Sequence, residues 1–228
     1  MDNQQYFLSI DNGTQSVRAM VFDAQGQLIA KSKIDIEPYF SDQPGWAEQH
    51  AEYFWDALCK ACQALWPLLP IPKESIAAVS VTTQRATAIA MGADNQPLRP
   101  AISWLDQRQV ETKPALGALE SALFTLVGAK PLADLMHKQA EANWIAQNEP
   151  NIWDKVHKFV LLSGYHNYKL TGEYKDAIAS TVGFLPFDYK TQQWADKRDW
   201  KWRAMPITQE MLPEVLPAGA ELGRITLQ

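Results

Sequence analysis

The sequence predicts an α/β domain. Three short apolar segments joined by tight turns open the chain, an amphipathic helix follows them, and strand-like and helix-like segments then alternate. The chain has 228 residues, of which 46% are hydrophobic and 21% are charged, so it can bury a full core and has the composition of a globular protein.

The opening segments are predicted strands at 6–10, 17–22 and 28–36, with a turn at 23–26. Because the connections are short, these strands should form an antiparallel meander. The pattern of the first strand is continuously apolar, as expected for a buried strand.

A helix is predicted from about 51 to 66, after a break at Pro44 and Gly45. It contains Cys59 and Cys62 in a CxxC spacing. Zinc would need further ligands, and a redox motif would need a strand-to-helix junction. We therefore interpret the two cysteines as thiols on an ordinary helix.

Further strands are predicted at 76–82, 86–91 and 101–104. A helical pattern runs from 110 to about 148, and the segment 156–173 reads as a short apolar strand leading into a helix. The remaining residues are mixed and rich in proline and tryptophan.

Polar residues follow three of these strands, after Ile10, after Thr82 and after Trp104. In open α/β sheets, ligands bind outside the carboxyl ends of strands. We therefore expect the three polar clusters to converge on one cleft.

The first cluster, "DNGTQS", has the residue types of a phosphate-binding turn. Backbone N–H groups near a glycine can point at an anion, hydroxyl and amide side chains add donors, and a carboxylate suits Mg²⁺. A polar β-turn capped by its aspartate is the alternative interpretation. The candidate residues are Asp11, also the candidate metal ligand, with Gly13, Thr14, Gln15, Ser16 and Arg18.

The second and third clusters suit a hydroxyl-rich ligand. Gln84 and Arg85 offer oriented donors at a strand end, and the indole of Trp104 offers a flat face for a sugar. Asp106 and Arg108 add an acceptor and further donors. The alternatives are a surface arginine in a hairpin, and a core tryptophan followed by a capped helix start.

Composition excludes several other classes. The net charge of −5 without a basic stripe argues against nucleic acid as a partner. No apolar run is long enough for a membrane helix, and no signal-peptide pattern is present, so we expect a cytoplasmic protein without a membrane partner. The P-loop and Rossmann glycine motifs are also absent from the sequence.

Six motifs in order resemble the N-terminal half of the FGGY carbohydrate kinases. Their sequences are "DNGTQSVR", "QPGWAEQHAEYFW", "VTTQRATAI", "PAISWLDQR", "DAIASTVGFLPFDYKTQQWAD" and "LPEVLPAGAELGRIT". Together they cover nearly the whole chain, and the set is far more specific than any one motif.

The resemblance implies a ribonuclease-H-like fold of the actin, hexokinase and Hsp70 type, with a mixed sheet flanked by helices. It implies that residues 1–228 form the sugar-binding domain of a kinase that uses ATP and Mg²⁺ to phosphorylate a hydroxyl of a sugar or polyol. Asp11 would lie near Mg²⁺, and Gly13, Thr14 and Arg18 would face the γ-phosphate. The residues implied on the sugar side are Gln84, Arg85, Trp104, Asp106 and Arg108.

Two departures from the family pattern argue against glycerol as substrate. Ala86 stands where glycerol kinases have a glutamate, and Met136 or His137 stands where the family has an aromatic residue facing the substrate. A pentulose, a hexulose, a sugar alcohol and a sugar acid all remain open.

A larger departure is that the family's general-base aspartate, in a G-x-x-D motif, and its C-terminal nucleotide-binding domain have no counterpart in this chain. We therefore expect negligible kinase activity from the chain alone. An apolar interdomain face would then be uncovered, so homodimer formation is a further expectation. A non-enzymatic sugar-sensing module and an actin- or Hsp70-like ATPase domain are the alternative functions.

Overall fold

The computed structural model describes residues 5–111, 118–126, 128 and 130–226. Its longer strands and helices are β1 (Tyr6–Asn12), β2 (Ser16–Asp23), β3 (Leu28–Asp35), α1 (Ala51–Leu65), β5 (Ile76–Thr83), α2 (Ala118–Leu126), α3 (Lys130–Gln139), α4 (Glu141–Asn148) and α6 (Leu162–Thr171). The shorter ones are β4 (Glu48–Gln49), β6 (Ala88–Met91), β7 (Ala101–Ile102), α5 (Pro150–Trp153), β8 (Lys158–Leu161), β9 (Lys175–Ala177), β10 (Phe187–Asp188), β11 (Gln193–Trp194), α7 (Lys201–Ala204) and β12 (Glu214–Leu216). Among these described residues, no helix has both the length and the apolar character needed to cross a membrane.

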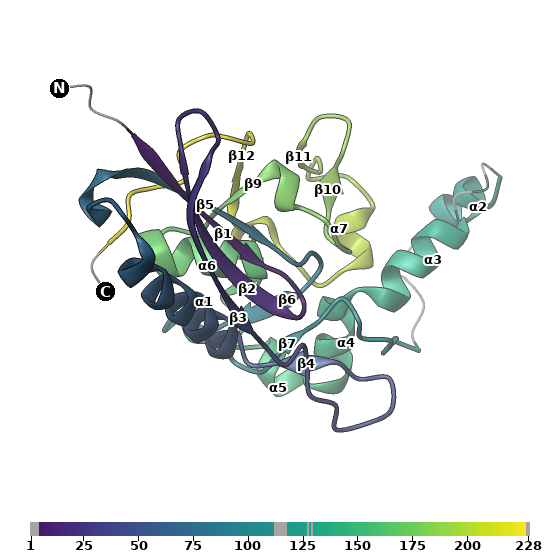
Figure 1. The fold of residues 1–228 in the computed structure, drawn as a ribbon. Helices are drawn as coiled ribbons and strands as arrows, with labels where there is room; N and C mark the ends of the chain where they lie inside the picture. The colour runs from purple at the N-terminus through teal and green to yellow at the C-terminus, as the bar shows by residue number, and fades with distance from the viewer. Residues whose placement is uncertain (1–4, 112–117, 127, 129, 227–228) are drawn as a thin grey trace.

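A mixed sheet in the order β3-β2-β1-β5 lies at the centre (Figure 1). β1, β2 and β3 are antiparallel neighbours, as the short turns predict, and β5 pairs with β1 in parallel. The side chains of β1 and β2 alternate in burial: Leu8, Ile10, Ala19 and Val21 are buried on one face.

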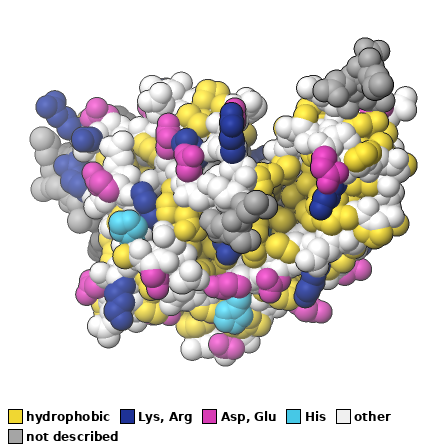
Figure 2. All heavy atoms as spheres, turned by 90° about the vertical axis from the view of Figure 1, so that its left-hand side faces the viewer, with side chains coloured by type: hydrophobic (Ala, Val, Ile, Leu, Met, Phe, Trp, Pro, Cys, Tyr) yellow, Lys and Arg dark blue, Asp and Glu magenta, His cyan; other side chains and the backbone are white. Residues whose placement is uncertain are grey.

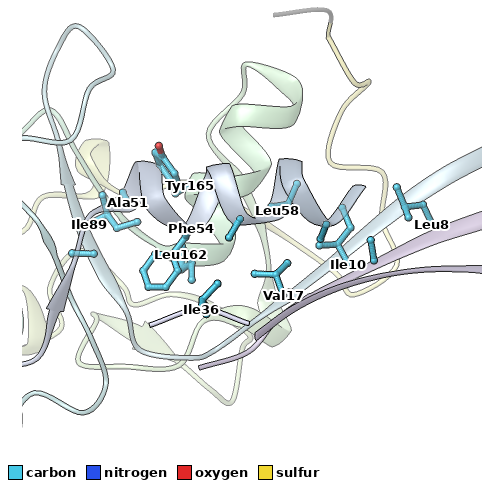
Figure 3. Close-up of a cluster of buried hydrophobic side chains, with 14 of the residues drawn as sticks. Leu8, Ile10, Val17, Ile36, Ala51, Phe54, Leu58, Ile89, Leu162 and Tyr165 are labelled. Carbon is cyan, nitrogen blue, oxygen red and sulfur yellow. The ribbon is translucent and has the colours of Figure 1, made fainter. Parts of the chain in front are cut away.

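Helix α1 covers the buried face of this sheet. Its apolar residues recur at helical spacing, so they form one stripe, and Phe54, Leu58 and Leu65 on that stripe are almost fully buried. Figure 3 shows the stripe against Leu8, Ile10 and Val17 of the sheet, with Leu162 and Tyr165 of α6 beside it. The sheet, α1 and α6 therefore share one hydrophobic core.

A second sheet, in the order β4-β7-β6-β8, separates this core from another one. In β6, Ile89 and Met91 belong to the first core, whereas Ala88 and Ala90 belong to the second. Because both faces are covered, all four residues are buried and the segment reads as a continuous apolar run.

The predicted elements are largely present, with differences at their ends. The strand predicted at 101–104 ends at Ile102, because the chain then turns, with the backbone N–H of Asp106 donating to Ser103 O at 3.0 Å. The helical pattern predicted from 110 to 148 forms the separate helices α2, α3 and α4, and 112–117 lie outside the described residues. Cys59 and Cys62 are free thiols on α1, as interpreted.

Charged side chains of both signs are scattered over the face shown in Figure 2. Among the described residues visible there, lysines and arginines do not gather into a continuous basic surface.

Strand β5 is an edge strand, and a groove of about 850 Å³ runs beside it. The groove is lined by β5, by part of α6 and by the segment 219–225. Ala77, Ala78 and Ser80 of β5 are exposed. A long edge strand with small, uncharged side chains is a template for pairing between copies.

We predict concentration-dependent self-association of this chain, and we predict that Ser80→Lys lowers the associated fraction, because a charged side chain protects an edge strand. Gln25→Lys is the matched control, since it adds the same charge in the exposed β2–β3 turn. Light scattering over a range of concentrations measures the effect. A monomer at all concentrations, or an equal effect of both substitutions, would contradict the role of β5.

Candidate functional site

The turn between β1 and β2 is closed by a hydrogen bond from Gly13 N–H to Ser16 O at 3.0 Å. The backbone of Gly13 is not in the left-handed region, and a Cβ there would meet only Ser16 O, at 3.5 Å. The turn itself therefore does not require glycine. A bare backbone at this position is consistent with close approach of a ligand.

Asp11 forms cross-strand contacts with both neighbouring strands. It lies opposite Arg18 on β2 and Thr82 on β5. The Arg18 Nη1 atom is 2.8 Å from Asp11 Oδ2, and the Thr82 hydroxyl donates to Asp11 Oδ1 at 3.4 Å. Both ion-pair partners are partly exposed, so the pair contributes at most about 1 kcal/mol to stability.

The segment after β5 is anchored to the end of β1, because Gln84 N–H donates to Asn12 O at 2.8 Å. The side chain of Gln84 is buried, and neither its amide oxygen nor its amide nitrogen has a partner among the described residues. Arg85 is exposed. Ala86 has a φ of 50°, an unfavourable conformation for a residue with a Cβ.

Trp104 lies two residues beyond β7, and its side chain is 52% exposed. Its indole N–H donates to the Thr14 hydroxyl at 3.3 Å. This contact joins the third polar cluster to the first.

The three clusters meet at one cavity of about 480 Å³. Its lining residues are Thr14, Thr83, Gln84, Arg85, Ala86, Trp104 and Val182. The predicted convergence of the strand ends is therefore present in the structure. The volume falls within the range of small-molecule sites, and the orphaned amide of Gln84 points to a polar ligand.

The sequence reasoning missed Val182, which comes from the segment after β9. That segment belongs to the "DAIASTVG" motif, which was matched as a whole without any residue being assigned to the site. A single small apolar residue carries no local signal for a binding role.

Gln15 and Ser16 do not line this cavity. Gln15 is exposed and its backbone O accepts the N–H of Ile36, whereas Ser16 is buried at the start of β2. Asp11 and Arg18 lie on the neighbouring strand surface rather than in the cavity lining. The residues predicted to face the phosphate therefore do not lie together. Of their side chains, only that of Thr14 lines the cavity.

Asp106 and Arg108 lie outside the cavity and are 3% and 4% exposed. Asp106 Oδ2 accepts the backbone N–H of Ala47 at 2.7 Å, and Arg108 donates from Nε and Nη2 to the Asp106 carboxylate, both at 2.7 Å. Arg108 also lies 2.8 Å from Glu48 and over the ring of Trp46. The prediction that Asp106 and Arg108 bind substrate is not supported, because their polar atoms are engaged in a buried network.

That network continues through a second arginine. Arg99 pairs with Glu48 through Nη2 and lies 2.7 Å from Glu149 through Nε. Through Glu48 and Glu149, the network connects β4 and the end of α4 to Asp106 and Arg108, in the loop that carries Trp104. We interpret the network as the support of the third cluster.

The comparisons with known proteins agree with this fold. The domain described as "FGGY family of carbohydrate kinases, N-terminal domain" matches residues 6–228. The glycerol kinase of Ectopseudomonas mendocina is 30% identical over 227 residues, which cover 96% of this chain and 45% of that protein.

Two solved structures have a similar fold. The gluconate kinase of Lactobacillus acidophilus matches with a TM-score of 0.77 and 19% identity, over 98% of this chain and 44% of that one. The Plasmodium falciparum glycerol kinase with ADP matches with a TM-score of 0.73 and 22% identity, over 99% and 46%. These likenesses confirm the predicted ribonuclease-H-like α/β fold, and the chain spans about half the length of the proteins it matches.

We predict that Asp106→Ala lowers the free energy of unfolding by about 3 to 5 kcal/mol, because it leaves Arg108 buried without its bidentate partner. Arg85→Ala should change it by no more than about 0.5 kcal/mol, because Arg85 is exposed. Urea unfolding measures both. If both substitutions lowered the free energy of unfolding equally, Asp106 would not belong to a structural network distinct from the cavity.

Proposed function

The chain belongs to the FGGY family of carbohydrate kinases, and on that premise we propose that it forms the sugar-binding side of an ATP-dependent phosphotransferase acting on a hydroxyl of a sugar or polyol. The observation that carries the proposal is the convergence of three strand ends on one cavity with an orphaned buried amide. A cavity that combines donors with the exposed ring of Trp104 suits the hydroxyls and C–H face of a carbohydrate.

Within this proposal, Gln84 and Arg85 bind substrate hydroxyls and Trp104 supports the ring or carbon chain. Gln84 can both donate and accept a hydrogen bond, and a hydroxyl group can do the same. Arg85 supplies up to five donors. The indole N–H of Trp104 is bonded to the Thr14 hydroxyl, and both residues line the cavity.

We propose that the first cluster faces the phosphate of ATP. Thr14 is the side chain shared by the turn and the cavity, so it lies between the two substrates. Gly13 offers bare backbone beside it. Phosphoryl transfer depends mainly on positioning and on neutralising charge, and Arg18 supplies a positive charge on the adjacent strand.

The residues present fit a Mg²⁺ ion at Asp11. Mg²⁺ commonly binds one or two carboxylates together with water and phosphate oxygens, and Asp11 offers a partly exposed carboxylate beside the turn. Among the described residues, no group of three acidic, histidine or cysteine side chains forms a metal site on its own. Asp11 would hold the ion, which supplies positive charge at the phosphates.

We further propose that residues 1–228 act as one sugar-binding domain. The nucleotide-binding part and the general base would then belong to the portion of the longer family members that this chain does not match. On this proposal the chain alone transfers no phosphate to a sugar.

We predict that a matching sugar or polyol raises the thermal midpoint of the chain, because a ligand that binds the folded state stabilises it. A screen of pentuloses, hexuloses, sugar alcohols and sugar acids measures this effect. Arg85→Ala and Gln84→Leu should each weaken binding by about 10- to 100-fold, the effect of losing hydrogen bonds to a polar ligand. Arg198→Ala, at an exposed arginine outside the cavity, is the matched control.

No shift with any compound of the panel would count against the proposed function. A shift that survives both cavity substitutions would place the carbohydrate elsewhere on the chain.

We predict that Asp11→Asn leaves the affinity for the sugar within about twofold, because Asp11 lies outside the cavity lining. The same substitution should remove any stabilisation of the chain by Mg·ATP, because an amide is a poor Mg²⁺ ligand. Thermal midpoints with sugar alone and with Mg·ATP alone measure the two effects. If Asp11→Asn abolished sugar binding and left the response to Mg·ATP unchanged, Asp11 would belong to the sugar side of the site and not to the phosphate side.

A further inference from the structure

Two of the three clusters depend on one buried residue at the end of β1. Asn12 is fully buried, and its backbone O accepts the N–H of Gln84 at 2.8 Å. Its side-chain Nδ2 donates to Gly13 O at 3.2 Å. Asn12 therefore touches both the turn after β1 and the first cavity residue after β5.

The side chain of Asn12 is held from outside the sheet. His166, on α6, places its Nε2 atom 2.8 Å from Asn12 Oδ1 and is itself fully buried. The rings of Trp55 and Tyr165 lie near the imidazole, with centroids 6.1 and 6.0 Å away. The contact joins residues 154 positions apart in the sequence.

The direction of this hydrogen bond follows from its neighbours. Because the Asn12 Nδ2 group faces the Gly13 carbonyl, the Oδ1 atom faces His166 and can only accept. His166 must therefore donate from Nε2–H. Burial lowers the pKa of His166 to about 3, so the ring stays neutral near pH 7 and carries its single proton on Nε2.

The simplest alternative is that His166 is an ordinary core side chain that fills space. An apolar residue of similar size would fill the same volume. It would, however, leave the buried Asn12 Oδ1 atom without its donor, and the loss would fall on Asn12 before other parts of the core. The two interpretations therefore differ in where the structure loosens.

We propose that His166 is a positioning residue for the site. By fixing the Asn12 side chain, His166 sets the distance between the turn at Gly13 and the backbone of Gln84. On the proposed function, this is the distance between the phosphate-binding and the sugar-binding parts of the site. The inference rests on the proposed function only for the interpretation of this distance as the one between phosphate and sugar. The positioning itself can be measured without any ligand.

The first test is the tautomer of His166, read from the imidazole nitrogen shifts of the ¹⁵N-labelled chain at pH 7 and pH 5. The expected result is one protonated nitrogen, Nε2, at both pH values. A ring protonated on Nδ1 alone, with Nε2 bare, would overturn the proposal, because Nε2 could then not donate to Asn12 Oδ1.

The second test compares His166→Gln with His166→Leu by amide hydrogen exchange. Glutamine places an amide N–H close to the position of the histidine Nε2, whereas leucine has no donor. In His166→Leu, exchange at the amides of Gly13 and Gln84 should accelerate about tenfold more than at the amides of β2, the effect of one hydrogen bond. In His166→Gln it should return to within about twofold of the parent chain.

Leu58→Ala is the matched control, because it opens the core under α1 and removes no hydrogen-bond partner of Asn12. It should accelerate exchange at Gly13, Gln84 and β2 alike. Uniform acceleration in His166→Leu, or failure of glutamine to rescue, would reduce His166 to a packing residue. If His166→Leu does not fold, two measurements remain decisive. They are the tautomer of His166 in the parent chain and the exchange rate of the Gln84 amide in His166→Gln.

The outcomes separate this inference from the proposed function. Absence of any sugar-induced thermal shift would refute the proposed function and leave the exchange results unaffected. A sugar-binding chain whose Gly13 and Gln84 amides are insensitive to His166 would refute the inference and leave the function standing.

Discussion

The burial of the Asn12 carboxamide at the end of β1 is the constraint on which the site depends. A buried amide must find partners, and the Asn12 carboxamide finds them in Gly13 O and His166 Nε2. The backbone O of the same residue accepts the N–H of Gln84. The strand ends are consequently fixed to one another rather than left as independent loops. Trp104 joins the same arrangement through Thr14, so the cavity has a defined shape before any ligand binds.

The third cluster is supported in a different way. Its loop is held by two buried arginines and three carboxylates, of which Glu149 is partly exposed, and Glu48 is shared between Arg99 and Arg108. Such a network is costly to bury, and its value lies in fixing geometry rather than in adding stability. The second sheet, buried on both faces, provides the rigid frame against which the loop is set.

The sequence was sufficient to predict the first sheet and α1, because alternation and helical spacing are local signals that Leu8, Ile10 and Phe54 carry in full. The convergence of the strand ends also followed from the fold class. The surroundings of Asp106 and Arg108 could not be predicted from the sequence, because a polar pair after a strand is equally compatible with a ligand site and with a buried ion pair. Their partners Glu48 and Ala47 are distant in the chain. The contact of Asn12 with His166 had no local signal, since its partners are far apart in the chain.

The most direct test of the central claim is to titrate a ¹⁵N-labelled chain with sugars and polyols and follow the side-chain signals of Trp104 and Gln84. If the three strand ends form a carbohydrate site, the indole N–H of Trp104 and the amide of Gln84 should shift together and saturate at one dissociation constant, while signals from the groove beside β5 stay unchanged. Saturable shifts in that groove, with Trp104 and Gln84 unaffected, would contradict the account.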